Sequence, residues 1–466
     1  MTVPLARDLP IRPEGCQRHH PGGATIDGVG RALAEVRIPL WSAEDRSVIP
    51  AVRPVRQALD RERIDDVPGA VAAELARPEI GARVAPGQEI AVAVGSRGIA
   101  SYAEVVAAVV RALRAAGARP FLVPAMGSHG GGTAAGQTSV LHSLGMTEES
   151  VGAPIRATMD AVEVGRLADG TPIHLDAHAA AADGIVLVNR VKPHTSFRGP
   201  VESGLSKLLV AGLGKTVGIT ALHKRGMERF ATMVPAGVEL IVARRPVLFG
   251  LALVENGHNQ LAHIEAIPAE AIGAREPQLL EMARERMPRL FFDELDVLVL
   301  ERIGKDISGP GFDPNVVGRN ARTCPVFGGP AIERIVALSL SPKSLGNAAG
   351  MGALDIITDR VLREIDFSAS YANSIASTYV EFAAMPLCAR TGADAVALAV
   401  RAVRGRAPEQ IRLVYARSTK ELAEIYASAA LDEHVRAHPR LEVAGPLRPL
   451  IEGDEPFPLA PGAAGS

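Results

Sequence analysis

Short apolar runs alternate with stretches of helical periodicity along most of this chain. Residues 88–96, QEIAVAVGS, form an apolar run that ends in glycine, which is typical of a buried parallel strand. Residues 101–118 carry apolar side chains at helical spacing, and Ser101 with Glu104 has the pattern of a capping box at a helix start. Residues 119–126 are the next apolar run. This order predicts an α/β fold with a mainly parallel first sheet.

The same alternation continues toward the C-terminus. A helix is predicted over 133–145, with Gly145 as its C-terminal stop, and another over 276–287. Further strands are expected in three segments, which are 182–191, 237–256 (two paired strands) and 295–304.

The chain length predicts more than one domain, because 466 residues exceed what one compact core usually holds. We predict two α/β domains, an N-terminal one over 31–272 and a C-terminal one over 273–450, with the active site in the crevice between them. Residues 1–30 are rich in proline and are expected to form an irregular arm. Residues 451–466 have the composition of a disordered tail.

Composition excludes several classes of partner. Hydrophobic residues make up 47% of the chain, charged residues 22% and aromatic residues 4%, and the formal net charge is −2. These values indicate a globular protein without a nucleic-acid or membrane footprint. The three cysteines, Cys16, Cys324 and Cys388, are too far apart in sequence for a metal knuckle or a disulfide framework. We therefore expect a cytoplasmic protein.

Lysine is unevenly distributed. The chain has only seven lysines among its 50 basic residues, and four of the seven lie between 192 and 224. These four are Lys192, Lys207, Lys215 and Lys224. A lysine amine can lose its proton when it is desolvated and can form covalent bonds, which a guanidinium cannot. The alternative is that these lysines only bind anions or lie in solvent.

Three predicted strand ends carry unusual loops. Arg97 follows the first strand in VGSRG, His129 follows the second in AMGSHGGG, and His194 follows a later one in NRVKPHTSF. Because ligands of open α/β sheets bind at the carboxyl ends of strands, we expect these loops to converge on one crevice. Two histidines there would suit a reaction with two acid/base groups, and an arginine would suit a carboxylate.

Each of these residues also has a structural interpretation. Arg97 can form an ordinary surface ion pair, and His194 can be a buried histidine whose hydrogen bonds are merely satisfied. The glycines around His129 can serve the turn itself or can form a cradle of backbone N–H groups for an anion. The loop matches neither the dinucleotide fingerprint nor the P-loop, and no HExxH or CxxC indicates a standard zinc site.

The order of these sites resembles that of the nickel-pincer lactate racemase family, which comprises 2-hydroxyacid racemases and epimerases. The likeness covers residues 85–320 and includes the segments LAHIEAI and GPGFDPN. It rests on five residues in the same order and setting, which are Arg97, His129, His194, Lys207 and His223. The interval from Lys207 to His223 also matches the spacing in that family between its cofactor lysine and its metal histidine.

The resemblance implies a covalent cofactor. In that family the lysine carries pyridinium-3-thioamide-5-thiocarboxylic acid mononucleotide, the nickel-pincer nucleotide, and a histidine completes the coordination of nickel. By position, Lys207 resembles the cofactor lysine and His223 the nickel ligand. Gly130 and Gly131 are expected to lie against the cofactor.

The resemblance further implies an isomerase. His129 and His194 resemble the paired acid/base histidines, and Arg97 resembles the arginine that binds the substrate. The expected reaction is racemisation or epimerisation of a 2-hydroxy acid by reversible hydride transfer. The expected partners are this small substrate and the proteins that make the cofactor, with no nucleic acid and no membrane.

The chain departs from the family pattern at three places. The first loop reads GSRG where the family usually reads DxTR, and ESGLSK stands where SGGRK precedes the cofactor lysine. A second-domain lysine motif, YQxxK, is replaced by VVGRN, which leaves Lys305, Arg319 and Arg322 as candidates for its role. Two alternatives therefore stay open. One is an enzyme of the same fold that performs proton transfer or elimination on a carboxylate without the cofactor, and the other is a non-catalytic nucleotide-binding protein.

Overall fold

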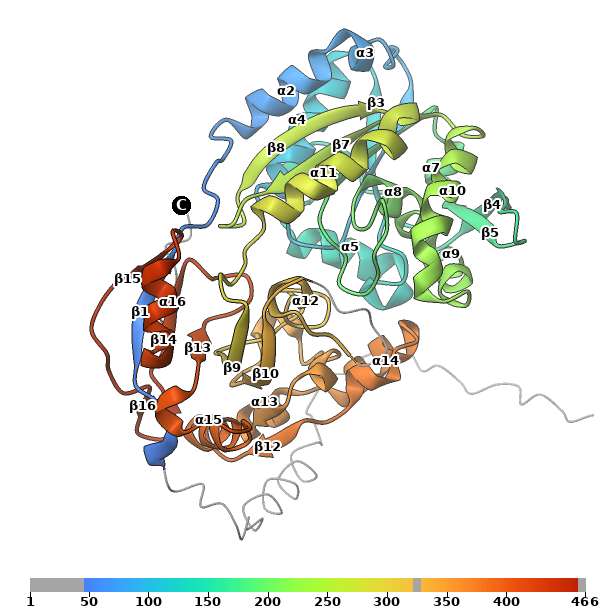
Figure 1. Cartoon of the computed structure of the whole chain (residues 1–466). Helices are drawn as coiled ribbons and strands as arrows, with labels where there is room; N and C mark the ends of the chain where they lie inside the picture. Colours follow the sequence, from blue (N-terminus) through green and yellow to red (C-terminus); the bar gives the residue numbers. More distant parts are fainter. Residues whose placement is uncertain (1–45, 322–327, 460–466) are drawn as a thin grey trace, which may run out of the picture. The chain divides into compact units, whose positions relative to one another are not determined.

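The computed structural model describes residues 46–321 and 328–459 (Figure 1). All of them belong to one compact unit, Ala43–Ser466. The predicted N-terminal arm, 1–30, lies outside the described residues.

The first sheet contains five strands in the order β3-β2-β6-β7-β8. Four of them run parallel, namely β2 (Glu89–Val94), β3 (Arg119–Pro124), β6 (Gly184–Arg190) and β7 (Val247–Glu255). The fifth, β8 (Leu261–Pro268), pairs antiparallel with β7. The prediction of an α/β fold with a mainly parallel first sheet is confirmed.

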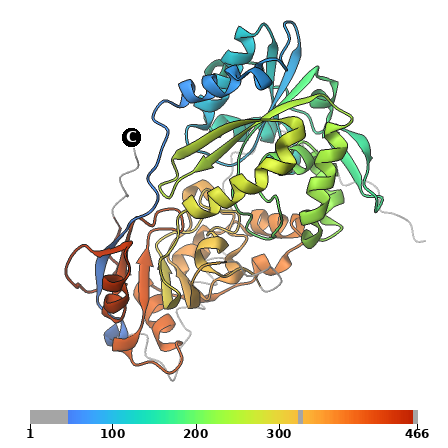
Figure 2. The same cartoon turned by 45° about the horizontal axis from the view of Figure 1, so that its top comes forward.

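Helices cover both faces of this sheet. On one face α2 (Val67–Ala76) and α4 (Tyr102–Ala115) share a hydrophobic core with the strands. On the other face α10 (Phe230–Val242) and α11 (Ile272–Arg286) share a second core with them. In both views α11 lies alongside the β7–β8 hairpin (Figures 1 and 2). Alternate residues of β2 belong to the two cores. Burial of both faces explains why the strands read as continuous apolar runs.

The other elements of this half are short. They are α3 (Pro78–Gly81), α5 (Ala134–Ser143), α6 (Glu148–Val151), β4 (Ala161–Arg166), β5 (Pro172–Asp176), α7 (Ala177–Ala181), α8 (Leu205–Lys207), a π-helical turn η3 (Leu208–Gly212) and α9 (Lys215–His223).

Two local predictions in this half were wrong. Ser101 precedes α4 with a left-handed φ of 49°, and its side chain makes no capping hydrogen bond. Residues 237–242, which we had assigned to a strand, form the second half of α10. Its buried residues include Val234, Val238 and Ile241, which follow helical spacing. A short apolar run does not by itself distinguish a buried strand from a buried helix.

The second sheet has eight strands in the order β12-β11-β10-β9-β13-β14-β1-β15. Its strands are β1 (Val52–Gln57), β9 (Glu294–Leu300), β10 (Ala331–Ala337), β11 (Ile356–Thr358), β12 (Leu387–Ala389), β13 (Leu413–Ala416), β14 (Glu424–Ser428) and β15 (Leu441–Val443). Its helices are α12 (Pro314–Val317), α13 (Asp359–Glu364), α14 (Phe367–Ala376), α15 (Gly392–Arg401) and α16 (Asp432–Ala437).

The boundary between the two sheets does not coincide with the boundary between the two predicted domains. Strand β1 pairs with β14 and β15, although it falls within the predicted N-terminal domain of 31–272. Helix α11 packs into the first core, which therefore extends past the predicted boundary between 272 and 273.

The predicted disordered tail needs correction. Ile451–Glu452 (β16) pairs with Glu455–Pro456 (β17), and Phe457 is buried. The carbonyl of Phe457 accepts a hydrogen bond of 2.9 Å from the Tyr415 hydroxyl. The composition of residues 451–466 indicated disorder, but burial of the Phe457 ring stabilises the segment around it. Residues 460–466 lie outside the described residues.

Within the described part of the chain, no single helix is long and apolar enough to cross a membrane. One pair of consecutive helical segments, Leu205–Gly212 and Lys215–His223, passes the test of length and composition together and is bent by 103° between them.

Candidate functional site

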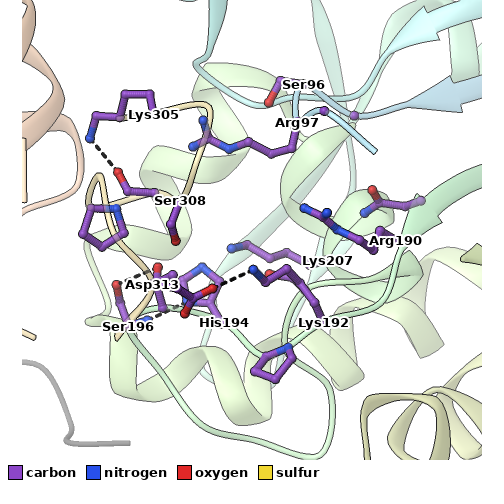
Figure 3. A pocket seen from close by; sticks show the side chains of 18 of the residues that line it. Ser96, Arg97, Arg190, Lys192, His194, Ser196, Lys207, Lys305, Ser308 and Asp313 are labelled. Atoms are coloured by element: carbon purple, nitrogen blue, oxygen red, sulfur yellow. Dashed lines mark hydrogen bonds and ion pairs between the residues drawn. The ribbon is translucent and has the colours of Figure 1, made fainter. Parts of the chain in front are cut away.

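A cavity of about 380 Å³ lies at the carboxyl ends of the first sheet's strands. This volume is within the range of small-molecule sites. Its lining includes the five residues that the sequence singled out for catalysis, substrate, cofactor and metal, which are Arg97, His129, His194, Lys207 and His223. Figure 3 shows the Lys207 amine pointing into the space between Arg97 and His194.

The topology of the sheet brings the three loops together. Strands β3, β2 and β6 are neighbours and run parallel, so their carboxyl ends lie at one edge. Arg97 follows β2, His129 follows β3 and His194 follows β6. The prediction that these loops converge on one crevice is confirmed.

The glycines after His129 do not line this cavity. Gly127 does, but Gly130 and Gly131 are not part of its lining. A side chain at Gly130 would meet the backbone of Gly136 at 2.6 Å, so packing against α5 requires a glycine there. The expectation that Gly130 and Gly131 lie against a ligand is therefore not supported by the position of the cavity.

Lys207 is an amine of the cavity that lacks a polar partner among the described residues, a property that it shares with Lys420. No described residue forms a hydrogen bond or ion pair with its Nζ, which lies 5.6 Å from the centre of the Phe197 ring. Burial and the nearby charge of Arg97 lower the pKa of Lys207 to about 7, against a smaller opposing effect of Glu202. The lysine ends α8 where the helix changes to the π-helical turn η3. Such turns are frequent at functional sites.

Glu276 holds the helical turn that carries Lys207. Its buried carboxyl group accepts hydrogen bonds from the Ser206 backbone N–H at 2.9 Å and from the Ser206 hydroxyl at 2.6 Å. Burial raises the pKa of Glu276 to about 7. Nothing in the sequence distinguishes this residue from an exposed acid of an amphipathic helix.

His129 is fixed through Nδ1, which lies 2.6 Å from the Ser96 hydroxyl. Its side chain is exposed toward the cavity, but the cavity walls and the charges of Arg97, Lys207 and Lys305 lower the pKa of His129 to about 3. Desolvation is the largest of these causes. The ring is therefore neutral at neutral pH.

His194 is also fixed through Nδ1, which accepts a hydrogen bond of 3.0 Å from the backbone N–H of Ser196. Its own backbone N–H donates to Glu202 at 2.6 Å, and its ring lies 4.4 Å from that of Phe197. Burial, followed by the charge of Lys207, lowers the pKa of His194 well below its usual value.

His223 ends α9 and donates a hydrogen bond of 3.0 Å from Nδ1 to the carbonyl of Ala376 in α14. A carbonyl can only accept, so the neutral ring keeps its lone pair on Nε2. A histidine that donates from one ring nitrogen to a carbonyl is oriented to bind a metal through the other. Burial lowers the pKa of His223, which favours the neutral form that a metal requires.

No group of three or more His, Cys, Asp or Glu side chains in the described residues could hold a metal ion. A metal at His223 would therefore need most of its ligands from a bound molecule. The lone pair on Nε2 fits the part of a single protein ligand.

Among the other cations that line the cavity, Arg97 and Lys305 have no carboxylate partner. Arg97 forms no hydrogen bond or ion pair with any described residue, and burial lowers its pKa. Lys305 comes from the loop after β9 and donates hydrogen bonds of 2.6 Å to the carbonyls of Gly309 and Ala349. Burial and the charge of Arg97 lower the pKa of Lys305 to about 7. With Lys207, these groups give the cavity positive charge without a carboxylate partner, which suits an anionic ligand.

Two lysines of the second half, Lys305 and Lys420, line the cavity, and of the three candidates named from the sequence only Lys305 is one of them. Of the other two candidates, Arg319 forms an ion pair of 2.7 Å with Asp355 and is not part of the lining, and Arg322 lies outside the described residues. Lys192 also lines the cavity, but its amine pairs with Asp313 at 2.8 Å.

Behind the cavity, Lys215 is fully buried. Its amine lies 2.9 Å from Asp176, which is also fully buried, and donates to the carbonyl of Pro124 at 2.6 Å and to Gln137 at 3.0 Å. Its φ of 52° lies in the left-handed region, which lysine rarely adopts. The buried ammonium of Lys215 thus has three acceptors, and the left-handed backbone at Lys215 places the side chain next to them.

The contacts of Lys215 reach the loop that carries His129. Gln137 donates a hydrogen bond of 2.8 Å to the carbonyl of Gly127 and a longer one of 3.4 Å to that of His129. Lys215 also begins α9, which ends in His223. The His129 loop and the helix of His223 are therefore joined at one buried charge, which the sequence analysis did not predict.

Comparisons with known proteins find one family model that is similar to part of the chain. The sequence model described as lactate racemase N-terminal domain matches residues 41–233. No curated protein matches the chain. Among solved structures, the lactate racemase apoprotein from Thermoanaerobacterium thermosaccharolyticum is 14% identical, covers 67% of this chain and 75% of its own, and has a TM-score of 0.42. A protein from Thermotoga maritima is 13% identical, covers 77% and 97%, and has a TM-score of 0.46.

Replacement of Lys215 by methionine is expected to destabilise the protein. Breaking one side of a buried ion pair leaves an uncompensated charge, so Lys215→Met should lower the free energy of unfolding by about 3–5 kcal/mol. Urea denaturation measures this change. The control is Lys224→Met, at an exposed position, with an expected change within about 0.5 kcal/mol. Equal stability of the two variants would show that the buried pair does not hold this region.

Lys207 is expected to react with amine reagents at neutral pH. Its pKa of about 7 leaves much of the amine unprotonated at pH 7.5, whereas an ordinary lysine, with a pKa of about 10.4, is almost entirely charged. Brief treatment with an acylating reagent, followed by peptide mass spectrometry, should label Lys207 well before exposed Lys224. Lys305 should be acylated more slowly than Lys207, because hydrogen bonds to two carbonyls stabilise its protonated form. Labelling of all three at one rate would contradict this assignment.

Proposed function

We propose that the protein is a racemase or epimerase of a 2-hydroxy acid, because residues 41–233 match the family model of the lactate racemase N-terminal domain. We further propose that it works by reversible hydride transfer with a nickel-pincer nucleotide attached to Lys207. The observation that carries this proposal is the unpartnered amine of Lys207, which faces the cavity with a pKa of about 7. A covalent amide-type link needs such an amine, and an arginine could not supply it.

The residues around the cavity fit the proposed cofactor. Lys207 would hold the nucleotide covalently, and His223 would offer its Nε2 lone pair to nickel. The bound group would supply a hydride acceptor. The positive charge of the cavity suits the phosphate of a nucleotide and the carboxylate of a substrate.

The chain's own residues would bind and orient the substrate. Arg97 would bind its carboxylate, and Lys305 would be a second cation for that group. The hydroxyl proton would pass to a histidine while the C2 hydrogen leaves as hydride, which gives a 2-keto acid. Return of the hydride to the opposite face and of a proton to the oxygen would give the other enantiomer. His129 and His194 are the candidates for moving the proton, because both are neutral imidazoles in the cavity.

The proposed reaction implies two kinds of partner, a small substrate and the proteins that make the cofactor. The substrate is a small 2-hydroxy acid, and a covalently attached nucleotide requires proteins that synthesise it. The alternative, an enzyme of this fold without the cofactor, would use the amine of Lys207 or a histidine as a base on a carboxylate substrate. The mass of the active protein distinguishes the two.

Replacement of Lys207 by arginine is expected to abolish racemisation without unfolding the protein. Lys207→Arg keeps the positive charge but removes the nucleophilic amine. Protein produced in a host that makes the nucleotide should carry a covalent mass increment on Lys207, and the variant should carry none. Intact-mass measurement and a chiral assay of a 2-hydroxy acid provide the two readouts.

The matched control is Lys192→Arg, in which the ion pair with Asp313 can persist. This variant should still carry the mass increment on Lys207. An active protein with the mass of the unmodified chain, or an active Lys207→Arg variant, would favour the cofactor-free alternative.

A further inference from the structure

The three histidines of the cavity are each fixed through Nδ1, but by different kinds of partner. A backbone N–H donates to His194, a hydroxyl lies against His129, and a carbonyl accepts from His223. The partner of Nδ1 determines which ring nitrogen carries the proton, and therefore what Nε2 can do in the cavity.

At His194 the partner permits only one neutral form. The N–H of Ser196 can only donate, so Nδ1 must be unprotonated and the proton must be on Nε2. A nitrogen that already carries a proton cannot act as a base. Protonation of the whole ring would place two N–H groups against each other at 3.0 Å. His194 is therefore built as a hydrogen-bond donor toward the cavity.

At His129 the partner permits both forms. The Ser96 hydroxyl can accept from Nδ1–H, which leaves the lone pair on Nε2 for a proton. When Nε2 takes up the proton, Nδ1–H still donates to the same hydroxyl. His129 can therefore accept and return a proton without losing its contact.

We propose that the two histidines are not interchangeable. His129 carries the substrate's hydroxyl proton in both directions, whereas His194 donates a hydrogen bond from Nε2–H to a substrate oxygen. This inference rests on the proposed function and narrows the role of His194 within it.

The proton and electron balance is simple. In oxidation, the hydroxyl proton goes to Nε2 of His129, and the C2 hydrogen leaves with its electron pair to the hydride acceptor, so that C–O becomes C=O. The 2-keto acid then turns about its C=O axis, which keeps its oxygen at His129 and presents its other face. This turn exchanges the positions of its carboxylate and its C3 substituent, so the carboxylate must pass from Arg97 to another cation of the cavity, such as Lys305. Return of the hydride to carbon and of the same proton to oxygen completes the inversion.

Positive charges near His129 and His194 help to keep both imidazole rings neutral, so that the position of the single ring proton matters. Lys207 acts on both histidines, together with Arg97 and Lys305 at His129 and with Arg198 and Lys192 at His194. Burial is the larger cause, and together with these cations it lowers the pKa of both rings, so each is neutral with a single N–H at neutral pH. In a neutral imidazole, the position of that proton decides between donor and base.

Nitrogen NMR tests the tautomers directly and needs neither cofactor nor activity. Protein labelled with ¹⁵N-histidine should show His194 as the Nε2–H tautomer at pH 7.5, with the signal assigned by its loss in His194→Gln. Ser196→Ala, which retains the backbone N–H, should leave this signal unchanged. An Nδ1–H tautomer or an imidazolium at His194 would overturn the proposal, whatever the enzyme's activity.

Variants of the loaded enzyme test the roles. A glutamine amide can donate a hydrogen bond but cannot take up a proton. His194→Gln should therefore lower kcat by about tenfold or less, the scale of one altered hydrogen bond. His194→Leu, with no donor, should lose more than His194→Gln. His129→Gln should lose about 10²–10⁴-fold, as expected for a missing general base.

Equal losses in His129→Gln and His194→Gln would overturn the proposal and restore two equivalent acid/base groups. Absence of racemisation in the loaded wild-type enzyme is a different result. It would refute the proposed function, and the NMR experiment would still decide the tautomer of His194.

Discussion

The site depends on one constraint of the first sheet, which is that β3, β2 and β6 lie side by side and end at the same edge. Three loops from distant parts of the chain can meet there only because parallel strands share a direction. Parallel neighbours require crossover connections, and the helices of these connections cover both faces of the sheet and bury them. The histidines of the second and third loops then face one cavity, and their partners decide what each ring can do.

Four neighbouring lysines show how burial and partners separate residues of one type. Lys207 faces the cavity without a polar partner, and Lys192 pairs with Asp313. Lys215 is buried against Asp176 behind the loop of His129, whereas Lys224 lies exposed at the end of α9. The local excess of lysine therefore has no single explanation. A covalent role is argued for one amine only.

Much of the first half was predictable, because a sheet buried on both faces leaves long apolar runs in the sequence. The gathering of Arg97, His129 and His194 followed from their positions after three such runs. The capping box at Ser101 failed, since the backbone there is left-handed. The partners of the rings were beyond sequence reasoning. The N–H that fixes His194 belongs to the backbone, and the Lys215 ion pair joins residues that are distant in sequence.

In the proposed reaction, a 2-hydroxy acid changes configuration by transfer of hydride rather than of a proton at C2. The most direct test is to incubate the loaded enzyme with single enantiomers of 2-hydroxy acids deuterated at C2, in ordinary water, and to analyse the product by chiral chromatography and mass spectrometry. A hydride held by a bound acceptor does not exchange with solvent, so the account predicts that the inverted product keeps its deuterium. Inversion with loss of deuterium to water would contradict the account, because it would show that an acid/base group of the protein removes the C2 hydrogen as a proton.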